Sequence, residues 1–138
     1  MTLTDIATTE VVTTSPDSGV REVLDEMEAE RVGSAVVTDG DEPIGIVSDR
    51  KIAMGLREAE SIDDVTVEDV MTEELVTIEA DHTHLDALEM MSDEGFRRLP
   101  IVDDGALAGI ITLDDLLVIS ATELGYASDV IEQQAGMH

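Results

Sequence analysis

Two segments of the chain contain residue types that suit the binding of a phosphorylated sugar. They are residues 45–51 (GIVSDRK) and residues 109–115 (GIITLDD). In each, an apolar run predicted as a strand delivers a hydroxyl side chain, Ser48 or Thr112, to the first turn of a predicted helix. A hydroxyl and free backbone N–H groups at a helix N-terminus suit an anion such as phosphate, and Asp115 is placed to accept hydrogen bonds from a ribose diol. A second interpretation stays open, because Thr112 and Asp115 also have the spacing of a helix capping box.

Positive charges gather near the same two segments. The chain has only seven lysines and arginines. Arg50 and Lys51 lie in the first segment, and Arg97 and Arg98 lie just before a predicted strand. In a chain so poor in cations we expect these pairs to have a specific role, and arginines bind phosphate oxygens through two parallel hydrogen bonds. The alternative is that the four cations neutralise neighbouring carboxylates.

The elements that position these residues occur twice, because the chain repeats itself with a shift of 64 positions and no gap. Residues 3–53 then align with residues 67–117, and twelve of the aligned pairs are identical, among them the Gly-Ile pair that opens both segments. Such a repeat indicates two copies of one structural unit. Each half, at about 60 residues, would be marginally stable alone. We therefore expect the halves to share a core and to bring both pairs of cations to one cleft.

Each half is predicted to fold as β-α-β-β-α. Helices are indicated by apolar residues at helical spacing, and turns by Ser-Pro and Asp-Gly sequences. In the first half the predicted strands are residues 11–14, 35–37 and 44–47, with helices over residues 20–27 and after Ser48. In the second half they are residues 75–78, 99–102 and 107–111, with one helix that begins at a Thr83–Asp86 capping box and another over residues 113–124 that Gly125 stops. We expect the first repeat to span residues 1–62, the second residues 63–124, and residues 125–138 to form a tail or short helix.

The composition limits the class of protein. The 138 residues are 43% hydrophobic and include no cysteine, which fits one compact domain without disulfides or thiolate chemistry. No apolar run approaches the length of about 18 residues expected of a membrane-spanning helix, and the first residues do not resemble a secretory signal. We therefore expect a cytoplasmic protein without a membrane partner.

The net charge of −26 is the most unusual property of the composition. Self-repulsion of this size destabilises a compact state. In about 1 M salt the Debye length is only about 3 Å, so the repulsion is largely screened. The charge therefore predicts a halophilic protein, with an acidic surface for a basic partner as the alternative. Binding of DNA or RNA is not expected, because an acidic surface repels phosphate backbones.

Three segments together resemble the CBS domain (cystathionine β-synthase domain) family, arranged as a tandem pair or Bateman module. They are VEDVMTEELVTIEAD, GFRRLPIVDDGALAGIITLDDLL and GIVSDRKIA, and the resemblance covers residues 3–124. It implies an α/β fold in which two pseudo-symmetric repeats place two small sheets face to face, with two clefts. It also implies homodimers, adenosine-containing ligands (AMP, ADP, ATP, S-adenosylmethionine, sometimes NAD) and a regulatory role rather than an enzymatic one.

The resemblance also implies roles for individual residues. Carried over to this sequence, Thr112 contacts ribose or phosphate and Asp115 holds the ribose hydroxyls. The other candidate binding residues are Ile78, Leu99 and Pro100, which would border the adenine, and the hydroxyl and basic positions Ser48, Arg50, Arg97 and Arg98. The first repeat departs from the pattern, because Lys51 stands in the place of the ribose-binding aspartate and Gly33-Ser34 in the place of two arginines. We therefore predict one occupied site per chain, organised by Asp115, with Arg50 reaching in from the other repeat.

These features predict a stand-alone CBS-pair regulatory module that binds AMP, ADP or ATP between its repeats and signals the occupancy to an unidentified effector protein. The alternatives are a ligand-free interaction or scaffold module and a sensor of S-adenosylmethionine or NAD. The arginines favour a phosphorylated ligand over the cationic sulfonium. No metal site is predicted from His82 and His84, which have no evident third ligand, and no catalytic cofactor is expected, although Mg²⁺ is compatible with bound ATP. No nucleophile–base pair is recognisable, so the sequence does not indicate an enzyme.

Overall fold

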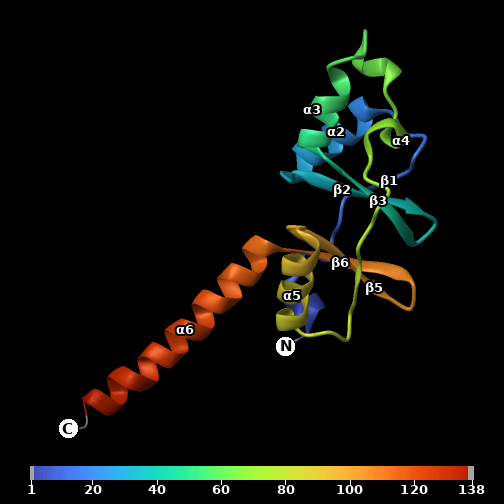
Figure 1. Ribbon diagram of the computed structural model, residues 1–138. Coiled ribbons are helices and arrows are strands. Elements are labelled where there is room, and N and C mark those ends of the chain that lie inside the picture. The colour runs from blue at the N-terminus through green and yellow to red at the C-terminus, as the bar shows by residue number, and fades with distance from the viewer. Residues whose placement is uncertain (1, 137–138) are drawn as a thin grey trace.

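The computed structural model describes residues 2–136 and consists of two halves of the same design (Figure 1). The first half contains α1 (Leu3–Ile6), β1 (Thr13–Thr14), α2 (Val20–Glu30), β2 (Ser34–Asp39), β3 (Glu42–Ser48) and α3 (Asp49–Leu56). The second contains the 3₁₀ helix η1 (Ile62–Asp64), α4 (Val67–Val70), β4 (Ile78–Glu79), α5 (His84–Glu94), β5 (Arg98–Asp103), β6 (Ala106–Thr112) and α6 (Leu113–Ala135). The predicted β-α-β-β-α order is confirmed in both halves. A short helix that the sequence patterns did not indicate, α1 or α4, precedes it in each.

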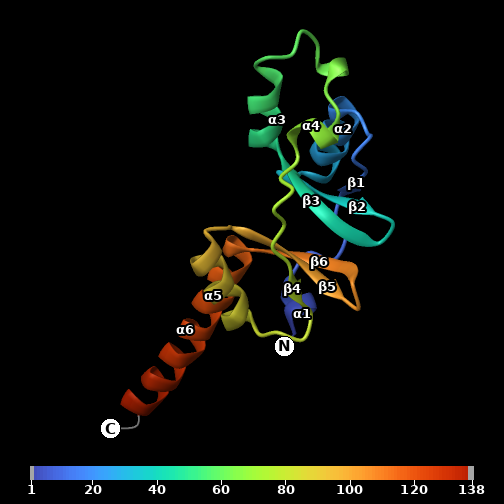
Figure 2. The same cartoon turned by 45° about the vertical axis from the view of Figure 1, so that its right-hand side comes forward.

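Each half builds one three-stranded sheet, with strand orders β1-β2-β3 and β4-β5-β6. The first strand of each sheet pairs in parallel with the second, which pairs antiparallel with the third. The register of the antiparallel pair shifts at the same place in both sheets, after Val37 and after Ile101. The repeat in the sequence therefore extends to the irregularities of the strands. β3 and β6 lie where the two halves meet (Figure 2).

The capping box predicted at the start of α5 is present. The hydroxyl of Thr83 accepts a hydrogen bond from the Asp86 N–H at 3.1 Å, and the carboxylate of Asp86 accepts one from the Thr83 N–H at 2.9 Å. This backbone hydrogen bond holds the pKa of Asp86 below its ordinary value. A lowered pKa stabilises the fold above the pKa of the unfolded chain, and the contribution is lost as the pH falls through the lowered value.

The two halves exchange the short helices that precede them. Leu3 of α1 is buried in the hydrophobic cluster of the second half, together with Leu99 and Ile111. Val67 and Val70 of α4 are buried in the cluster of the first half. In Figure 2, α1 lies beside β4, far from the sheet of its own half. The expected sharing of a core therefore takes the form of a reciprocal exchange between two clusters, and neither half completes its core without the other.

A close backbone contact joins the halves on each side and explains the Gly-Ile pair in both repeats. The N–H of Ile110 donates to the carbonyl oxygen of Thr8 at 2.9 Å. A β-carbon on the preceding residue, Gly109, would lie only 2.9 Å from that same oxygen. Gly45 has the same relation to the carbonyl oxygen of Thr72. Only glycine allows the two chain segments to approach this closely.

This contact gives a test of how the halves are joined. We expect Gly109→Ala to lower the free energy of unfolding by about 1–3 kcal/mol, because the added methyl group forces two backbones apart. Gly125→Ala is the control: a β-carbon there meets nothing within 4 Å, and alanine is favoured by about 1 kcal/mol inside a helix. Urea unfolding measures both. Equal stability of the two variants would show that the approach at Gly109 does not hold the halves together.

The last helix is longer than predicted. α6 runs without a break from Leu113 to Ala135, so the predicted stop at Gly125 was wrong. Gly125 keeps a right-handed helical conformation, since the glycines with positive φ are elsewhere. One glycine costs a helix only about 1 kcal/mol, which the helix-forming residues on both sides offset. The predicted tail is therefore mostly helix, and its residues 137–138 lie outside the described residues. Within residues 2–136, no helix is both long and apolar enough to cross a membrane.

Candidate functional site

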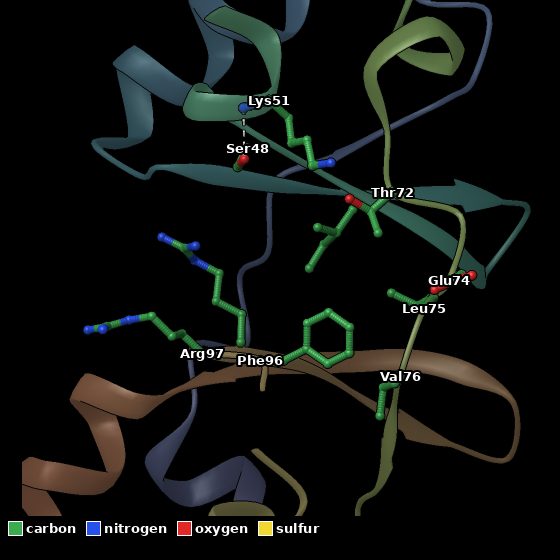
Figure 3. A pocket seen from close by; sticks show the side chains of 10 residues that line it. Ser48, Lys51, Thr72, Glu74, Leu75, Val76, Phe96 and Arg97 are labelled. Carbon is green, nitrogen blue, oxygen red and sulfur yellow. Dashed lines mark hydrogen bonds between the residues drawn. The ribbon is translucent and has the colours of Figure 1, made fainter. Parts of the chain in front are cut away.

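A cavity of about 210 Å³ lies between the two halves. One wall comes from the first half, where β3 ends and α3 begins, and the other from the segments before β4 and β5 of the second half (Figure 3). Its lining residues are Ile46, Ser48, Lys51, Thr72, Glu74, Leu75, Val76, Phe96, Arg97 and Arg98. The cavity that these residues line is called the first cavity below. It lies between the strand-turn-helix of one repeat and the loops of the other.

The first cavity combines an apolar interior with three cations. Phe96, the single phenylalanine of the chain, points between the two walls in Figure 3. Lys51 enters from above, and Arg97 and Arg98 come from the second half. Of the charged residues that line the cavity, Glu74 alone is acidic. The first cavity therefore carries a local excess of positive charge in a chain whose net charge is −26.

Local hydrogen bonds fix the two sides of this cavity. Ser48 is the N-cap of α3, and its hydroxyl accepts a hydrogen bond from the Lys51 N–H at 3.2 Å. On the other side, the carbonyl oxygen of Arg97 accepts a hydrogen bond from the Leu113 N–H at 2.8 Å. The loop that carries the arginines is thereby tied to the first residue of α6. The cations consequently sit on backbone that is held at both helix starts.

A second cavity, of about 160 Å³, occupies the equivalent place on the other side of the repeat interface. It is lined by Thr8, Glu10, Val11, Val12, Val32, Gly33, Ser34, Arg98, Ile110 and Thr112. Apart from Arg98, each of these residues is the repeat counterpart of one that lines the first cavity. Because Gly33 and Ser34 replace two arginines, this cavity has Arg98 as its single lining cation.

Asp115 takes part in the capping box that the sequence left as an alternative. Its carboxylate accepts a hydrogen bond from the Thr112 N–H at 3.0 Å, and its own N–H donates to the Thr112 hydroxyl at 3.1 Å. Thr112 lines the second cavity, whereas Asp115 is not among its lining residues. The capping interpretation therefore describes Asp115 in this structure, one turn away from the cavity.

The structure divides the predicted binding residues between the two cavities and sites outside them. Ser48 and Arg97 line the first cavity, Thr112 lines the second, and Arg98 lines both. The others line neither cavity: Ile78 and Leu99 are buried in the cluster of the second half, Pro100 is buried within β5, and Arg50 is exposed on α3. The sequence assigned all of these residues to a single cleft. It missed Phe96, Leu75 and Val76, although the only phenylalanine next to two arginines was a signal.

Carboxylates neighbour some of the cationic and histidine side chains without forming a metal site. Arg97 lies 3.7 Å from the carboxylate of Asp114, and both side chains are exposed, at 72% and 84%. An exposed pair of this kind contributes little, so Arg97 remains able to bind an anion. His82 contacts Asp86 and His84 contacts Glu123, each at 3.2 Å. Among the residues that the structure describes, no three histidine or acidic side chains gather as metal ligands would.

Two pseudo-symmetric α/β repeats that enclose a cavity on each side of their interface define a paired-repeat module. A family model described as the CBS domain matches residues 3–58 and again residues 67–121. The chain therefore belongs to the CBS domain family and consists of a tandem pair of these domains. The resemblance seen in the sequence is confirmed.

Relatives of known sequence agree with this assignment. The CBS domain-containing protein YhcV of Bacillus subtilis is 35% identical over 114 residues, covering 83% of this chain and 81% of that protein. An uncharacterized protein of Methanopyrus kandleri is 37% identical over 118 residues, covering 83% of this chain. An inosine-5'-monophosphate dehydrogenase of Methanocaldococcus jannaschii is 38% identical over 117 residues, covering 82% of this chain. The chain matches 60% of the Methanopyrus protein and 22% of the dehydrogenase.

Solved structures show the same fold. The CBS-domain containing protein ATU1752 of Agrobacterium tumefaciens superposes with a TM-score of 0.74 at 26% identity, over 87% of this chain and 99% of the other. The CBS domain pair of protein MJ0100, solved in complex with 5'-methylthioadenosine and S-adenosyl-L-methionine, superposes with a TM-score of 0.78 at 21% identity, over 89% and 98%. The arrangement of the two repeats is therefore that of other CBS pairs.

Proposed function

We propose that this chain is a regulatory module that binds an adenine nucleotide, AMP, ADP or ATP, between its repeats and passes the occupancy on to an effector protein. The observation that carries the proposal is the first cavity, which gathers three of the seven cations of the chain around an apolar interior. An apolar pocket with a few convergent polar groups is the usual form of a small-molecule site. A regulatory module of this kind acts through its partner rather than as an enzyme.

The chemistry of the first cavity suits the three parts of a nucleotide. The ring of Phe96, beside Leu75 and Val76, offers a face on which a base stacks. The hydroxyl of Ser48 offers a hydrogen bond to a ribose. Arg97 offers a planar guanidinium to phosphate oxygens.

The size of the first cavity suggests how a nucleotide would be oriented. A volume of about 210 Å³ is below the range of about 300–1,000 Å³ that encloses a whole drug-sized ligand. We therefore expect the base inside the cavity and the phosphates at its mouth. The side chain of Arg97, which is 72% exposed, is accessible to such phosphates.

The second cavity is proposed as a weaker site. Thr112 lines it and Asp115 lies one helical turn further on, so these two remain our proposed contacts to phosphate and ribose. Arg98 is its single lining cation, which gives a phosphate less compensation than the first cavity does. The CBS pair of MJ0100 is a precedent for adenosyl ligands on this fold. For this protein we favour a phosphorylated ligand, because the cations that line the two cavities repel the sulfonium of S-adenosylmethionine.

The proposed signal is a shift between two packings of the repeats. A ligand in the first cavity contacts both halves, so it favours the packing in which both walls fit it, by no more than its difference in affinity for the two states. The backbone contacts across the interface, such as the hydrogen bond between Ile110 and Thr8, are the elements that would move. α6 starts where β6 ends and leads away from the module (Figure 1), which makes it the natural carrier of such a change to a partner.

The proposal is tested by thermal unfolding in about 2 M KCl with AMP, ADP, ATP, NAD or S-adenosylmethionine. A ligand at 100 times its dissociation constant adds about 2.7 kcal/mol to the stability. We expect one of the adenine nucleotides to raise the melting temperature by several degrees, and Arg97→Ala to abolish most of that shift. Arg57→Ala is the matched control, because Arg57 is exposed and lines neither cavity.

Two outcomes would contradict the proposal. If no nucleotide changes the melting temperature, the chain is better described as a ligand-free interaction module. If a nucleotide stabilises the Arg97→Ala and Arg57→Ala variants equally, the ligand binds elsewhere than in the first cavity.

A further inference from the structure

The cations of the first cavity lie in two separate places. Lys51 comes from α3 of the first half, whereas Arg97 and Arg98 come from the start of β5 in the second half, Arg97 just before the strand and Arg98 as its first residue. In Figure 3 the amine of Lys51 points toward the side where Thr72 lies, and the guanidinium of Arg97 points to the opposite side. A single phosphate chain that reaches the arginines would therefore leave the positive charge of Lys51 without a partner.

Among residues 2–136, Lys51 also has no carboxylate partner. The chain has 33 acidic residues and seven basic ones, so a cation could easily have been paired. The ion pairs among residues 2–136 involve Arg21, Arg97 and two histidines, and none includes Lys51. A cation that lines a cavity and stays unpaired amid an excess of acids is suited to an anionic group of a ligand.

The two repeats have opposite charges at this position. Lys51 and Asp115 are both the third residue of the helix that follows a hydroxyl N-cap, Ser48 or Thr112. In the dinucleotide sites of doubly-wound α/β folds, an acid hydrogen-bonds to the free 2'-hydroxyl of the ribose, whereas a basic side chain accommodates a phosphate on that hydroxyl. If nucleotides bind as proposed above, Lys51 in the place of an acid favours a ribose that carries a phosphate instead of a free hydroxyl.

We propose that the ligand of the first cavity is an adenine nucleotide phosphorylated on the 2'- or 3'-hydroxyl of its ribose as well as on the 5'-hydroxyl. The arginines bind the 5'-phosphate and Lys51 binds the phosphate on the ribose. The proposal rests on the function proposed above and names the chemical class of its ligand.

The test compares ligands that carry the same number of phosphates in different places. ADP, adenosine 2',5'-bisphosphate and adenosine 3',5'-bisphosphate are titrated calorimetrically into the full chain at one fixed KCl concentration. We expect one of the bisphosphates to bind about tenfold more tightly than ADP, which is the size expected for one charge-assisted hydrogen bond. ADP matches the bisphosphates in the number of phosphates, and a preference that is lost in the Lys51 variant below reports the position of the second phosphate.

Two variants assign the preference to one side chain. Lys51→Asp should remove or reverse it, and the variant should fold well, because aspartate three residues after the Ser48 N-cap forms the same capping box that Thr112 and Asp115 form. Arg57→Asp makes the same change of charge at the other end of α3, outside both cavities, and should keep the preference.

The outcomes separate this inference from the function proposed above. ADP binding as tightly as both bisphosphates, or an unchanged preference in Lys51→Asp, would overturn the inference and leave nucleotide binding standing. Failure of all three ligands to bind, together with no thermal shift by AMP or ATP, would overturn both.

Discussion

Raising the KCl concentration from about 0.1 M to about 3 M should increase the melting temperature by about 15–20 °C, which for a domain of this size corresponds to about 5 kcal/mol of stability. At low salt the chain should be largely unfolded or expanded near room temperature. Circular dichroism at a series of salt concentrations measures both quantities.

The expectation follows from where the charges lie. The net charge is −26, and no charged side chain among residues 2–136 is buried. The carboxylates therefore face solvent, where they repel one another over a Debye length of about 10 Å at 0.1 M salt. At molar salt that length falls to about 3 Å, so most pairs of surface carboxylates no longer interact. The unfolded chain spreads the same charges further apart, and low salt consequently favours it.

A neutral osmolyte separates charge screening from general stabilisation. Sucrose strengthens the burial of apolar surface by its exclusion from the protein, but it does not screen charge. We expect sucrose at the osmolality of 3 M KCl to recover only a small part of the increase. An increase as large as that in KCl, or a flat response to KCl, would show that repulsion does not limit the stability and that the acidic surface serves another purpose, such as a basic partner.

The sequence predicted the parts of the fold that depend on local patterns. The alternation of strands and helices, the capping box at Thr83 and the alternative capping box at Thr112 follow from residues close together in the chain, and the comparison of the two halves gives the repeat. Gly125 shows the limit of such reasoning, because the usual glycine stop needs a left-handed backbone, whereas Gly125 has no positive φ and stays in α6. The exchange of α1 and α4 was beyond local patterns, since each helix packs against residues of the other half.

The candidate site was predicted only in part, because local patterns show which residues could bind a ligand but not how the fold groups them. The hydroxyl and basic residues were recognised by type, and Ser48, Arg97, Arg98 and Thr112 do line cavities. Their grouping could not be predicted, because it depends on which loop faces which helix start across the repeat interface. Of the two expected clefts, the one organised by Asp115 was predicted to hold all the binding residues, whereas the structure divides several of them between two cavities of different charge. Arg98 could not be assigned to one of them even in principle, because it lines both.

One face of α6 carries large apolar side chains that are exposed to solvent. Among its residues Leu117, Leu124 and Ile131 are exposed at 57%, 71% and 69%, and they recur every seven residues. A seven-residue repeat of large apolar residues supplies one of the two apolar positions of a coiled-coil heptad, and it forms a seam on one face of the helix along which a second helix can pack. The helix spans 23 residues, or about 34 Å at 1.5 Å per residue, and it extends away from the rest of the chain (Figures 1 and 2).

A second copy of this chain is the partner that this seam fits best. An identical helix brings the same seven-residue spacing, and a twofold axis pairs the two seams along their whole length. We therefore propose a homodimer joined through α6, and we expect light scattering after gel filtration in about 2 M KCl to give twice the mass of one chain. High salt matters here too, because it reduces the repulsion between two chains of the same negative charge.

Leu124→Glu should dissociate this dimer, because it places an unpaired carboxylate at the centre of the seam. The loss of a buried apolar contact and the cost of burying that charge should raise the dissociation constant at least about a hundredfold. Gln133→Glu adds the same side chain to the same helix, nine residues on and therefore on the opposite face, and it should leave the dimer intact. A wild-type chain that elutes as a monomer at high salt would refute the dimer. The apolar seam of α6 would then be the surface that binds the effector protein.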